Sequence, residues 1–382
     1  MDFSLTEEQQ MFHDLFRDFA EKEVAKVAEH TDRAEEPPIE LFKKAAAQGF
    51  LGANTPEQYG GAALDTLTTT LLIESIARHC LSTAVTLAIH TALASGSILD
   101  AGTEEQKETY LPRLAGGELA AFALTEPEAG SDAQALQTQA IADNGHYRLN
   151  GVKSWVSNAG PASVLVVIAR TGPENLSAFI VEKTSPGLSL GQREPTLGVR
   201  GVDIRTVYLE DVRVPAANLL GALHGGWPIA LRAFDRVRVC LAAAALGAAE
   251  GALALGVKFA AERKQFGTSI ANKQAIQNMV ADSAVEIESL RHFVHHTAWL
   301  ADTGQPYSQA ASMVKYLGAR VAKDAANKML QVHGGYGFSD EYVISRVYRD
   351  VRALRFLGGT DEIGRFAVAR EVFAETGMKL QP

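Results

Sequence analysis

The sequence predicts a mainly α-helical protein with a β domain in its centre. The first third has apolar residues at helical spacing, whereas residues 120–220 contain short β-branched runs separated by clusters of Gly, Pro, Asn and Asp. From Trp227 onward the chain returns to long Ala-rich segments with helical spacing. We expect three domains: an N-terminal helical domain (residues 1–118), a middle β-barrel or sandwich domain (119–221) and a C-terminal four-helix bundle (222–382).

Composition limits the classes to which the protein can belong. Its 382 residues are enough for two or three domains, and 47% hydrophobic with 21% charged residues is the profile of a folded globular chain. The formal net charge of -9 argues against a protein that neutralises nucleic-acid phosphates. Cys80 and Cys240 are far apart in apolar surroundings, so we expect neither a disulfide framework nor a thiolate metal site.

The N-terminal segment and the longest apolar stretch indicate where the protein works. The N-terminus reads MDFSLTEEQQ, without the basic and apolar regions of an export signal, so we expect a cytoplasmic protein. The apolar stretch from Leu241 to Val257 is mostly Ala and Gly and is interrupted by Glu250, which makes it too short and too polar to cross a bilayer. We therefore expect neither a membrane nor a nucleic acid as a partner.

Capping and periodicity set the expected elements. Ser4 and Thr6 precede Glu7 and Gln9 in a capping-box pattern, and apolar residues follow at helical spacing from Met11. Further helical patterns cover residues 40–48, 66–78, 83–99 and 104–114, the β-branched runs lie at 164–169, 178–181 and 206–209, and the bundle helices are expected at about 227–264, 271–302, 308–333 and 339–376.

Two segments of the β domain have groups suited to a flat polar ligand. The first, LTEPEAGSD (residues 124–132), places hydroxyls and loop amides after a short apolar strand, although a plain Pro/Gly turn has the same pattern. The second, GVKSWVSNAG (151–160), pairs a turn with Trp155, whose ring suits either a ligand or the core.

Three further segments interrupt the helices of the last third. ERKQFG (262–267) has adjacent cations, which suit a pyrophosphate but also favour any helix C-terminus. HGGYGF (333–338) allows close approach of backbone to a ligand or simply ends a helix, and GGTDEI (358–363) breaks one long helical pattern. The glycines of HGGYGF follow a helix instead of a strand, so they do not form a dinucleotide-binding turn.

Taken in order, LTEPEAGSD, GVKSWVSNAG, LEDVRVP, ERKQFG, HGGYGF and GGTDEI resemble the acyl-CoA dehydrogenase family of flavoproteins across essentially the whole chain. The resemblance implies FAD bound between the β domain and the four-helix bundle. It also implies a homotetramer, built as a dimer of dimers, in which each FAD touches two subunits. An acyl-CoA or carrier-bound acyl thioester is the implied substrate, and electron-transferring flavoprotein is the implied electron acceptor.

The resemblance also implies which residues form the site. The residues that match contacts to the flavin and its ribityl chain are Phe122, Leu124, Thr125, Gly130 and Ser131, with Trp155 and Ser157 against the isoalloxazine and Thr360 and Glu362 on the bundle side. The residues that match contacts to the diphosphate and adenosine of the neighbouring subunit's FAD are Arg263, Phe266, Gln274, Gln331 and Gly335. The residues that match the substrate site are Ser131, Asp235 and Arg238.

The sequence departs from the family at the catalytic base. Family dehydrogenation removes the α-hydrogen of the acyl group as a proton, and a positioned base contributes roughly 10²–10⁴-fold to such a step. Most members carry a glutamate immediately before the Gly-Thr/Ser pair, where this chain has Gly358. A minority carry it before the arginine that matches Arg238, where this chain has Val237. The backbone N–H of Gly358 remains available to polarise the thioester carbonyl.

Three hypotheses reconcile this departure with the family. In the first, α,β-dehydrogenation uses another base, for which His90 is the leading candidate and Asp100 and Glu362 are weaker ones; a polar core residue is the competing interpretation of His90. In the second, the reaction needs no α-proton abstraction, as in reduction of an enoyl thioester or loss of a carboxylate- or sulfinate-like group. In the third, the chain is a non-catalytic subunit that binds FAD or acyl-CoA.

A metal enzyme and a hydrolase are not expected. His292, His295 and His296 lie close together on one predicted helix, but no acidic partner completes a site and solvated helix histidines are common. No Gly-x-Ser-x-Gly nucleophile elbow occurs in the sequence.

Overall fold

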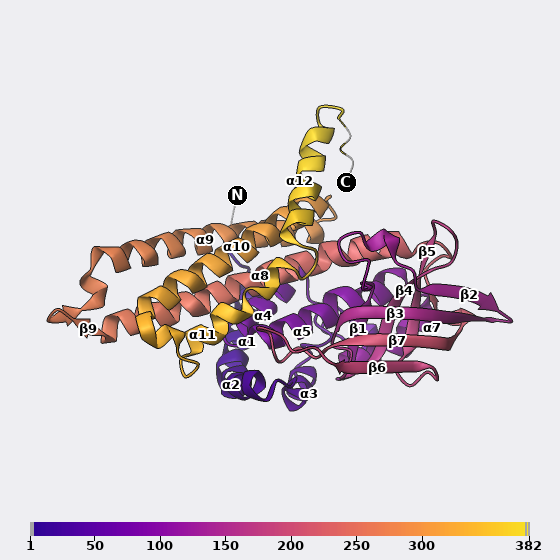
Figure 1. The fold of residues 1–382 in the computed structure, drawn as a ribbon, viewed down its shortest axis with the longest axis horizontal. Helices are drawn as coiled ribbons and strands as arrows, with labels where there is room; N and C mark the ends of the chain where they lie inside the picture. The colour runs from indigo at the N-terminus through magenta and orange to yellow at the C-terminus, as the bar shows by residue number, and fades with distance from the viewer. Residues whose placement is uncertain (1–3, 379, 381–382) are drawn as a thin grey trace.

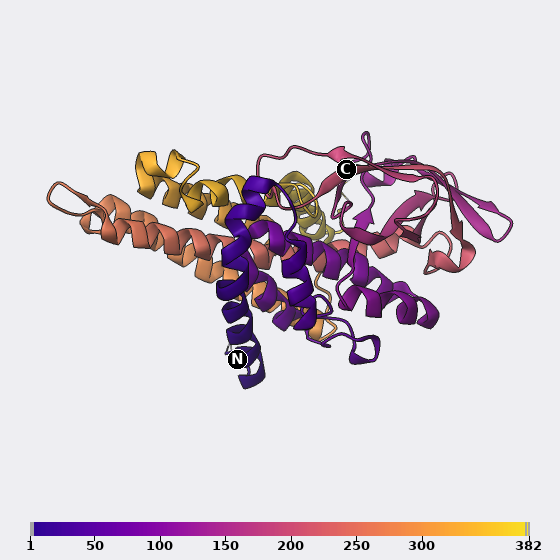
Figure 2. The same ribbon diagram turned by 90° about the horizontal axis from the view of Figure 1, so that it is seen from below.

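The computed structural model describes residues 4–378 and 380, and it has helices at both ends of the chain with a β-sheet between them. The sheet lies at one end of the long axis of the molecule, and the small β9–β10 hairpin (Lys264–Gln265 and Thr268–Ser269) lies at the other end (Figure 1). A view turned by 90° shows the same separation (Figure 2). The expected order of helical, β and helical regions is confirmed.

The first helix begins where its capping signal predicts. Thr6 is the N-cap of α1 (Glu7–Phe19), and its side chain and that of Gln9 form a reciprocal capping box. Phe16 on this helix is fully buried and packs edge-on against Phe50, with ring centroids 5.1 Å apart. The remaining helices of this region are η1 (Ala20–Val24), α2 (Ala25–Ala34), α3 (Ile39–Ala47), η2 (Glu57–Tyr59), α4 (Thr66–Ala77), α5 (Leu81–Ala88), η3 (Ile89–Ser95), α6 (Gly96–Ala101) and α7 (Glu104–Ala115).

The middle of the chain forms an eight-stranded sheet with the path β6-β7-β3-β2-β4-β5-β8, and β1 pairs in parallel with β4 outside this path. The strands are β1 (Leu119–Ala123), β2 (Gln139–Asp143), β3 (His146–Ser157), β4 (Ala162–Arg170), β5 (Leu176–Glu182), β6 (Leu188–Arg193), β7 (Ile204–Pro215) and β8 (Leu219–Leu220). The β-branched runs identified in the sequence lie within β4, β5 and β7.

Both faces of the central strands are buried, which explains their nearly continuous apolar sequences. Phe122 and Val166 face α6, α7 and α8 and join a core with Ile98, Leu111 and Ile229. The alternate residues of β4 and β5 pack instead against side chains of β3 and β7. The sheet therefore curls over a second core, as expected of a sandwich-like domain, and its first face rests on the helices.

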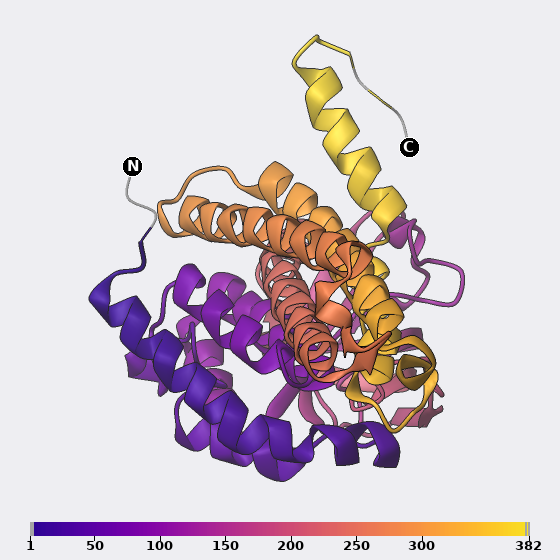
Figure 3. The same cartoon turned by 90° about the vertical axis from the view of Figure 1, so that its left-hand side faces the viewer.

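The C-terminal region is helical, but its last segment is divided. Three long helices, α8 (Gly226–Glu262), α9 (Gln274–Asp302) and α10 (Ser308–His333), agree with the predicted ranges. After η7 (Gly334–Phe338), the fourth expected helix (339–376) is divided into α11 (Val343–Asp350), η8 (Ala353–Arg355) and α12 (Asp361–Ala374). The break lies at Gly358 and Gly359, whose φ angles of 67° and 102° are left-handed. After it, α12 projects from the body of the molecule (Figure 3).

Two helical stretches, Leu81–Ala101 and Gly226–Glu262, are long and apolar enough to cross a membrane by length and composition alone. Their most apolar windows are 94% and 78% buried inside the protein. On α8 the packing is close, because a Cβ added at Gly247 would lie 2.0 Å from the carbonyl oxygen of Glu74 on α4. Burial against the rest of this chain therefore accounts for the apolar character of both stretches.

Candidate functional site

The loop after β1 and the end of β3 lie side by side. The backbone N–H of Ser154 donates to the Thr125 carbonyl at 2.8 Å, which joins the two segments singled out in the β domain. Thr125 is half-buried, and Gly130 and Ser131 are exposed farther along the loop. A Cβ added at Gly130 would meet no atom within 4 Å, so the surface beside this glycine is open.

Trp155 has the features of a ligand-binding residue. Its side chain is 61% exposed, although a tryptophan in a strand is usually covered. It lies where the pairing of β3 with β7 shifts between Lys153 and Val156, and its φ of 57° is unusual for a bulky residue. A backbone distortion that turns a large aromatic side chain toward solvent is typical of a binding site. Ser157, two residues later, is almost fully buried.

The Gly358–Gly359 turn is fixed by two cations from the bundle. Arg238 Nε donates to the Gly358 carbonyl at 3.1 Å, and Lys315 Nζ donates to the Gly359 carbonyl at 2.5 Å. Thr360 then caps α12 by accepting the N–H of Ile363 at 3.3 Å. Both carbonyls of the turn are therefore held by protein groups.

The two positions at which family members carry the base face the same point. A Cβ added at Gly358 would lie 3.6 Å from Val237 Cγ1 and 3.0 Å from Leu241 Cδ1. Val237 is 1% exposed on a regular turn of α8. An apolar surface therefore occupies the place where either glutamate would present its carboxylate.

Asp235 and Arg238 form one polar group on α8 beside this surface. Arg238 Nη1 lies 3.2 Å from Asp235 Oδ1, and its guanidinium lies over the ring of Phe234 at 5.8 Å from the centroid. Phe234 in turn packs edge-on against Phe122 of β1, with centroids 6.5 Å apart. Burial lowers the pKa of Arg238, although Asp235 opposes this effect. These contacts join the predicted substrate residues to the β domain.

The geometry does not support His90 as the substitute base. His90 is fully buried in η3, and the backbone N–H of Ala120 donates to its Nδ1 at 3.1 Å. Burial lowers the pKa of His90 to about 4, so the ring is neutral at neutral pH. Because Nδ1 is the acceptor, the proton lies on Nε2, and the lone pair needed by a base is already in use. His90 instead connects η3 to β1.

The two weaker base candidates are also placed elsewhere. The carboxylate of Asp100 pairs with Arg236, whose Nε donates to the Ala92 carbonyl at 3.0 Å. Glu362 is exposed in the first turn of α12, where hydrogen bonding to its own backbone N–H lowers the pKa of its carboxyl. Neither carboxylate is among the atoms next to a Cβ added at Gly358, which are those of Leu241, Val237 and Arg238.

A second set of predicted residues lies at the far end of the bundle. Arg263 and Gly335 line a hollow of about 730 Å³, and Arg263 lies over the ring of Tyr336 at 5.2 Å from its centroid. Phe266 is 92% exposed at the tip of the β9–β10 hairpin, and Gln274 and Gln331 are also exposed. Figure 1 shows this hairpin far from the sheet. Within one chain, therefore, the two sets do not come together.

Sequence reasoning missed part of this hollow. Phe259 stacks on His333 with ring centroids 4.3 Å apart, and Tyr342 closes the group at 6.1 Å from His333. Tyr336 lies within the HGGYGF motif and was therefore recoverable from the sequence. Phe259 and Tyr342 carry no such signal, since each is an ordinary aromatic of a helical pattern.

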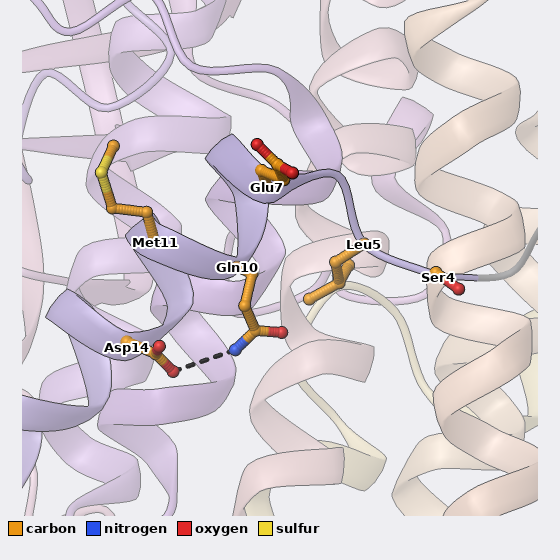
Figure 4. Close-up of a pocket in the computed structure, with 6 residues that line it drawn as sticks. All are labelled: Ser4, Leu5, Glu7, Gln10, Met11 and Asp14. Carbon is orange, nitrogen blue, oxygen red and sulfur yellow. Dashed lines mark hydrogen bonds between the residues drawn. The ribbon is translucent and has the colours of Figure 1, made fainter.

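A hollow at the start of α1 and a histidine cluster on α9 lie outside the predicted site. A hollow of about 730 Å³ at the start of α1 is lined by residues of one short segment, among which Gln10 Nε2 donates to Asp14 at 2.9 Å (Figure 4). His292 lies 3.2 Å from Glu288, and burial lowers the pKa of His295 to about 4. Within residues 4–378 and 380, no three His, Cys, Asp or Glu side chains gather as a metal-binding group.

Comparison with known protein families assigns the chain. The models for the N-terminal, middle and C-terminal domains of acyl-CoA dehydrogenases match residues 6–118, 121–212 and 224–373. The chain belongs to the acyl-CoA dehydrogenase family. It is similar to the acryloyl-CoA reductase (NADH) of Anaerotignum propionicum, with 45% identity over 97% of this chain and 96% of that protein. It is 37% identical to CarC, a subunit of the caffeyl-CoA reductase-Etf complex of Acetobacterium woodii, over 95% of this chain and 98% of that protein.

Solved acyl-CoA dehydrogenase structures have the same fold. Butyryl-CoA dehydrogenase from Megasphaera elsdenii superposes with a TM-score of 0.95 at 35% identity, covering 98% of this chain and 100% of that one. An acyl-CoA dehydrogenase from Bacillus anthracis in complex with FAD superposes with a TM-score of 0.93 at 35% identity, covering 98% of this chain and 68% of that one. This acyl-CoA dehydrogenase family member is an FAD-dependent oxidoreductase, as the sequence predicts.

The residues of this chain fit FAD. The exposed ring of Trp155 and the open surface at Gly130 can accept a flat aromatic ligand, and Arg263 beside exposed backbone glycines suits a diphosphate. The exposed ring of Phe266 is likewise suited to cover a ligand.

Proposed function

We propose that the chain is a reductase of α,β-unsaturated acyl thioesters, with an acyl-CoA or carrier-bound acyl group as substrate. One observation carries the proposal: Gly358 and Val237, the two positions of the family base, face one apolar point and neither provides a carboxylate. The site therefore lacks the carboxylate with which family dehydrogenases remove the α-proton, and the similarity to acryloyl-CoA reductase supports the reductive direction.

FAD, when bound, supplies hydride transfer to or from the β-carbon of the thioester. The chain contributes the positions of the surrounding groups. Arg238 and Lys315 hold the carbonyls of Gly358 and Gly359, which fixes the peptide turn next to the apolar surface. The N–H of Gly358 is the group proposed to stabilise negative charge that develops on the thioester oxygen.

Both directions of the reaction cross the same transition state, so loss of the base slows dehydrogenation and reduction by the same factor. Dehydrogenation must remove a proton from a weakly acidic carbon, and water is a poor base for that step. Reduction produces an enolate, which is itself a strong base and takes a proton from water or a nearby donor without a dedicated carboxylate. The apolar surface around Val237 therefore leaves proton exchange to solvent or a nearby donor in either direction, and the reduction potential of the bound flavin and the thioester supplied set which direction runs.

The acryloyl-CoA reductase and caffeyl-CoA reductase relatives support this direction. A second candidate, α,β-dehydrogenation of an acyl thioester with a base from elsewhere, is supported by the similarity to butyryl-CoA dehydrogenase over the whole chain. The two candidates use the same cofactor and the same bond of the substrate, so a direct comparison of rates distinguishes them.

The test compares both half-reactions without oxygen. In one, the FAD of the holoenzyme is reduced chemically and mixed with short-chain enoyl-CoAs, and reoxidation is followed by flavin absorbance. In the other, oxidised holoenzyme is mixed with the matching saturated acyl-CoAs, and bleaching is followed. We expect reoxidation to be at least tenfold faster than bleaching. Faster bleaching would establish the dehydrogenase instead, and no reaction in either direction would support a non-catalytic subunit.

We further propose electron-transferring flavoprotein as the redox partner and a dimer of dimers as the assembly. The membership of CarC in a complex with Etf supports the first. The second is supported by the separation of the two half-sites, since about 25 residues of α8 between Arg238 and Arg263 span about 37 Å. This separation supports a site that is completed by the bundle tip of a second subunit, and the pairing of two such dimers rests on the family resemblance.

A further inference from the structure

We propose that Lys153 and Glu126 are positioning residues for FAD, because their buried ion pair fixes the loop of Thr125 against the strand that carries Trp155. Lys153 lies on β3 and is 0% exposed, and Glu126 lies in the loop after β1 and is 7% exposed. Lys153 Nζ is 2.7 Å from Glu126 Oε1. No contact with FAD is assigned to either side chain.

The lysine also holds the backbone of the loop. Lys153 Nζ donates to the Leu124 carbonyl at 3.0 Å, and the N–H of the next residue, Ser154, donates to the Thr125 carbonyl at 2.8 Å. Two successive carbonyls of the loop are therefore bound by two successive residues of β3. This leaves the half-buried Thr125 in a fixed orientation next to the exposed Trp155.

The glutamate extends the same network to the other end of the loop. Its Oε2 accepts the N–H of Gln137 at 2.5 Å, and its Oε1 accepts the N–H of Thr138 at 2.9 Å. Its backbone also pairs with Ala129, with the two N–H to carbonyl distances at 3.2 and 3.1 Å. One carboxylate therefore joins the beginning of the loop to the segment that enters β2.

Stability alone does not explain a buried pair of this kind. Removing two charges from water is costly, and apolar residues of similar volume often replace such pairs without loss of stability. An ion pair with fixed hydrogen-bond directions does, however, select one geometry. Here that geometry sets the spacing between Thr125 and the strained backbone of Trp155, two groups whose separation must match a rigid ring system.

Both members of the pair are suited to remain charged. Burial lowers the pKa of Lys153 to about 8, while the carboxylate of Glu126 opposes that effect. Burial raises the pKa of Glu126, but the ammonium of Lys153 and the amide of Gln137 more than offset this, so its pKa lies below the ordinary value. At neutral pH an ammonium and a carboxylate therefore face each other.

The test measures FAD binding by the full-length apoprotein of Lys153→Met, Glu126→Gln and a control, Arg113→Met. Arg113 also bridges carboxylates, lying 2.6 Å from Glu182 and 2.9 Å from Glu118, but at the opposite end of β1. The dissociation constant of FAD is obtained from fluorescence titration, and the visible circular dichroism of bound FAD reports its surroundings. Thermal unfolding of each apoprotein establishes that it is folded.

We expect Lys153→Met to raise the dissociation constant tenfold or more and to change the circular dichroism of the bound flavin. Glu126→Gln, which can still accept both loop N–H groups, should raise it threefold or more, and Arg113→Met should stay within twofold of the wild type. A folded Lys153→Met protein with an unchanged constant and spectrum would overturn the proposal. So would an equal effect of Arg113→Met. Should Lys153→Met fail to fold, the Glu126→Gln protein decides: binding within twofold of the wild type, with an unaltered spectrum, refutes the positioning role.

Discussion

A side chain at position 237 and one at position 358 enter the same small volume, although 120 residues of chain separate them. Val237 Cγ1 lies 3.6 Å from the place of a Cβ at Gly358, so the two family solutions for a base are alternative routes to one point. The sequence shows that both positions lack a carboxylate. It does not show their convergence, because that depends on how the turn after η8 packs on α8.

This convergence predicts that a single substitution can restore a base. Val237→Glu introduces a carboxylate on a regular helix, whereas Gly358→Glu requires a φ of 67° and displacement of Leu241. Burial raises the pKa of a carboxyl and so strengthens it as a base. We expect Val237→Glu to accelerate bleaching of the flavin by saturated acyl-CoA by about 10²-fold or more.

Val237→Gln is the matched control, since it adds the same volume without a basic group. Stopped-flow absorbance under anaerobic conditions measures both variants. Equal rates for the glutamate and glutamine variants would show that this point does not face the α-carbon of the substrate.

At the scale of elements, helix and strand types follow from periodicity, and the junctions between elements do not. The predicted helix at residues 83–99 is present as the continuous stretch from α5 through η3 to α6, but η3 has π-helical geometry that no sequence pattern announces. His90 lies in this segment and hydrogen-bonds β1. The geometry argues against the predicted role of His90 as a base, because the N–H of Ala120, a partner that no sequence pattern indicates, occupies the lone pair of Nδ1. The fourth expected helix (339–376) is also shorter than its range: the sequence indicates the interruption at GGTDEI, but not the earlier end of α11 at Asp350.

His90, in η3, gives the free energy of unfolding a specific pH dependence. The pKa of His90 is about 4 when folded and near the ordinary value of 6.5 when unfolded, so the unfolded chain binds the extra proton between these limits. The contribution of the neutral His90 ring to the free energy of unfolding is fully present above pH 6.5 and is lost as pH falls toward 4. Over that interval it amounts to about 3 kcal/mol.

His90→Gln keeps a hydrogen-bond acceptor for Ala120 but removes the titration. We expect its free energy of unfolding, measured by urea denaturation, to fall less steeply than that of the wild type between pH 6.5 and 4.5. His30→Gln, at an exposed position of α2, serves as the control and should follow the wild type. Parallel curves for the wild type and His90→Gln would contradict the buried neutral ring.

At the scale of the whole molecule, the cofactor residues fall into two groups that one chain keeps apart. Trp155 lies on β3 and Thr125 follows β1, whereas Arg263 and Phe266 lie on either side of β9. Figure 1 shows β9 far from β1 and β3. Each group was predicted from its own motif. The family resemblance implies that the two groups bind different FAD molecules. The structure adds that α8 separates them within one chain.

This separation predicts complementation between defective subunits. A Trp155→Ala chain keeps the FAD-binding residues of the bundle tip intact, and an Arg263→Glu chain keeps those of the β domain intact. Each variant alone should bind little FAD, whereas random mixing during refolding or coexpression should restore about one FAD site in four. Absorbance of bound flavin per protomer measures the yield, and mixtures no better than either parent would show that each protomer builds its own site.

Helix α8 runs without interruption from the surface around Val237 to the bundle tip. One residue inserted near its middle would turn everything beyond by about 100° and advance it by about 1.5 Å. In the proposed assembly, the inserted chain would still bind the isoalloxazine of its own FAD, whereas its displaced bundle tip would no longer contact the adenosine of the FAD in its neighbour. Under that proposal, an insertion in one copy of the polypeptide would cause the binding defect in another copy.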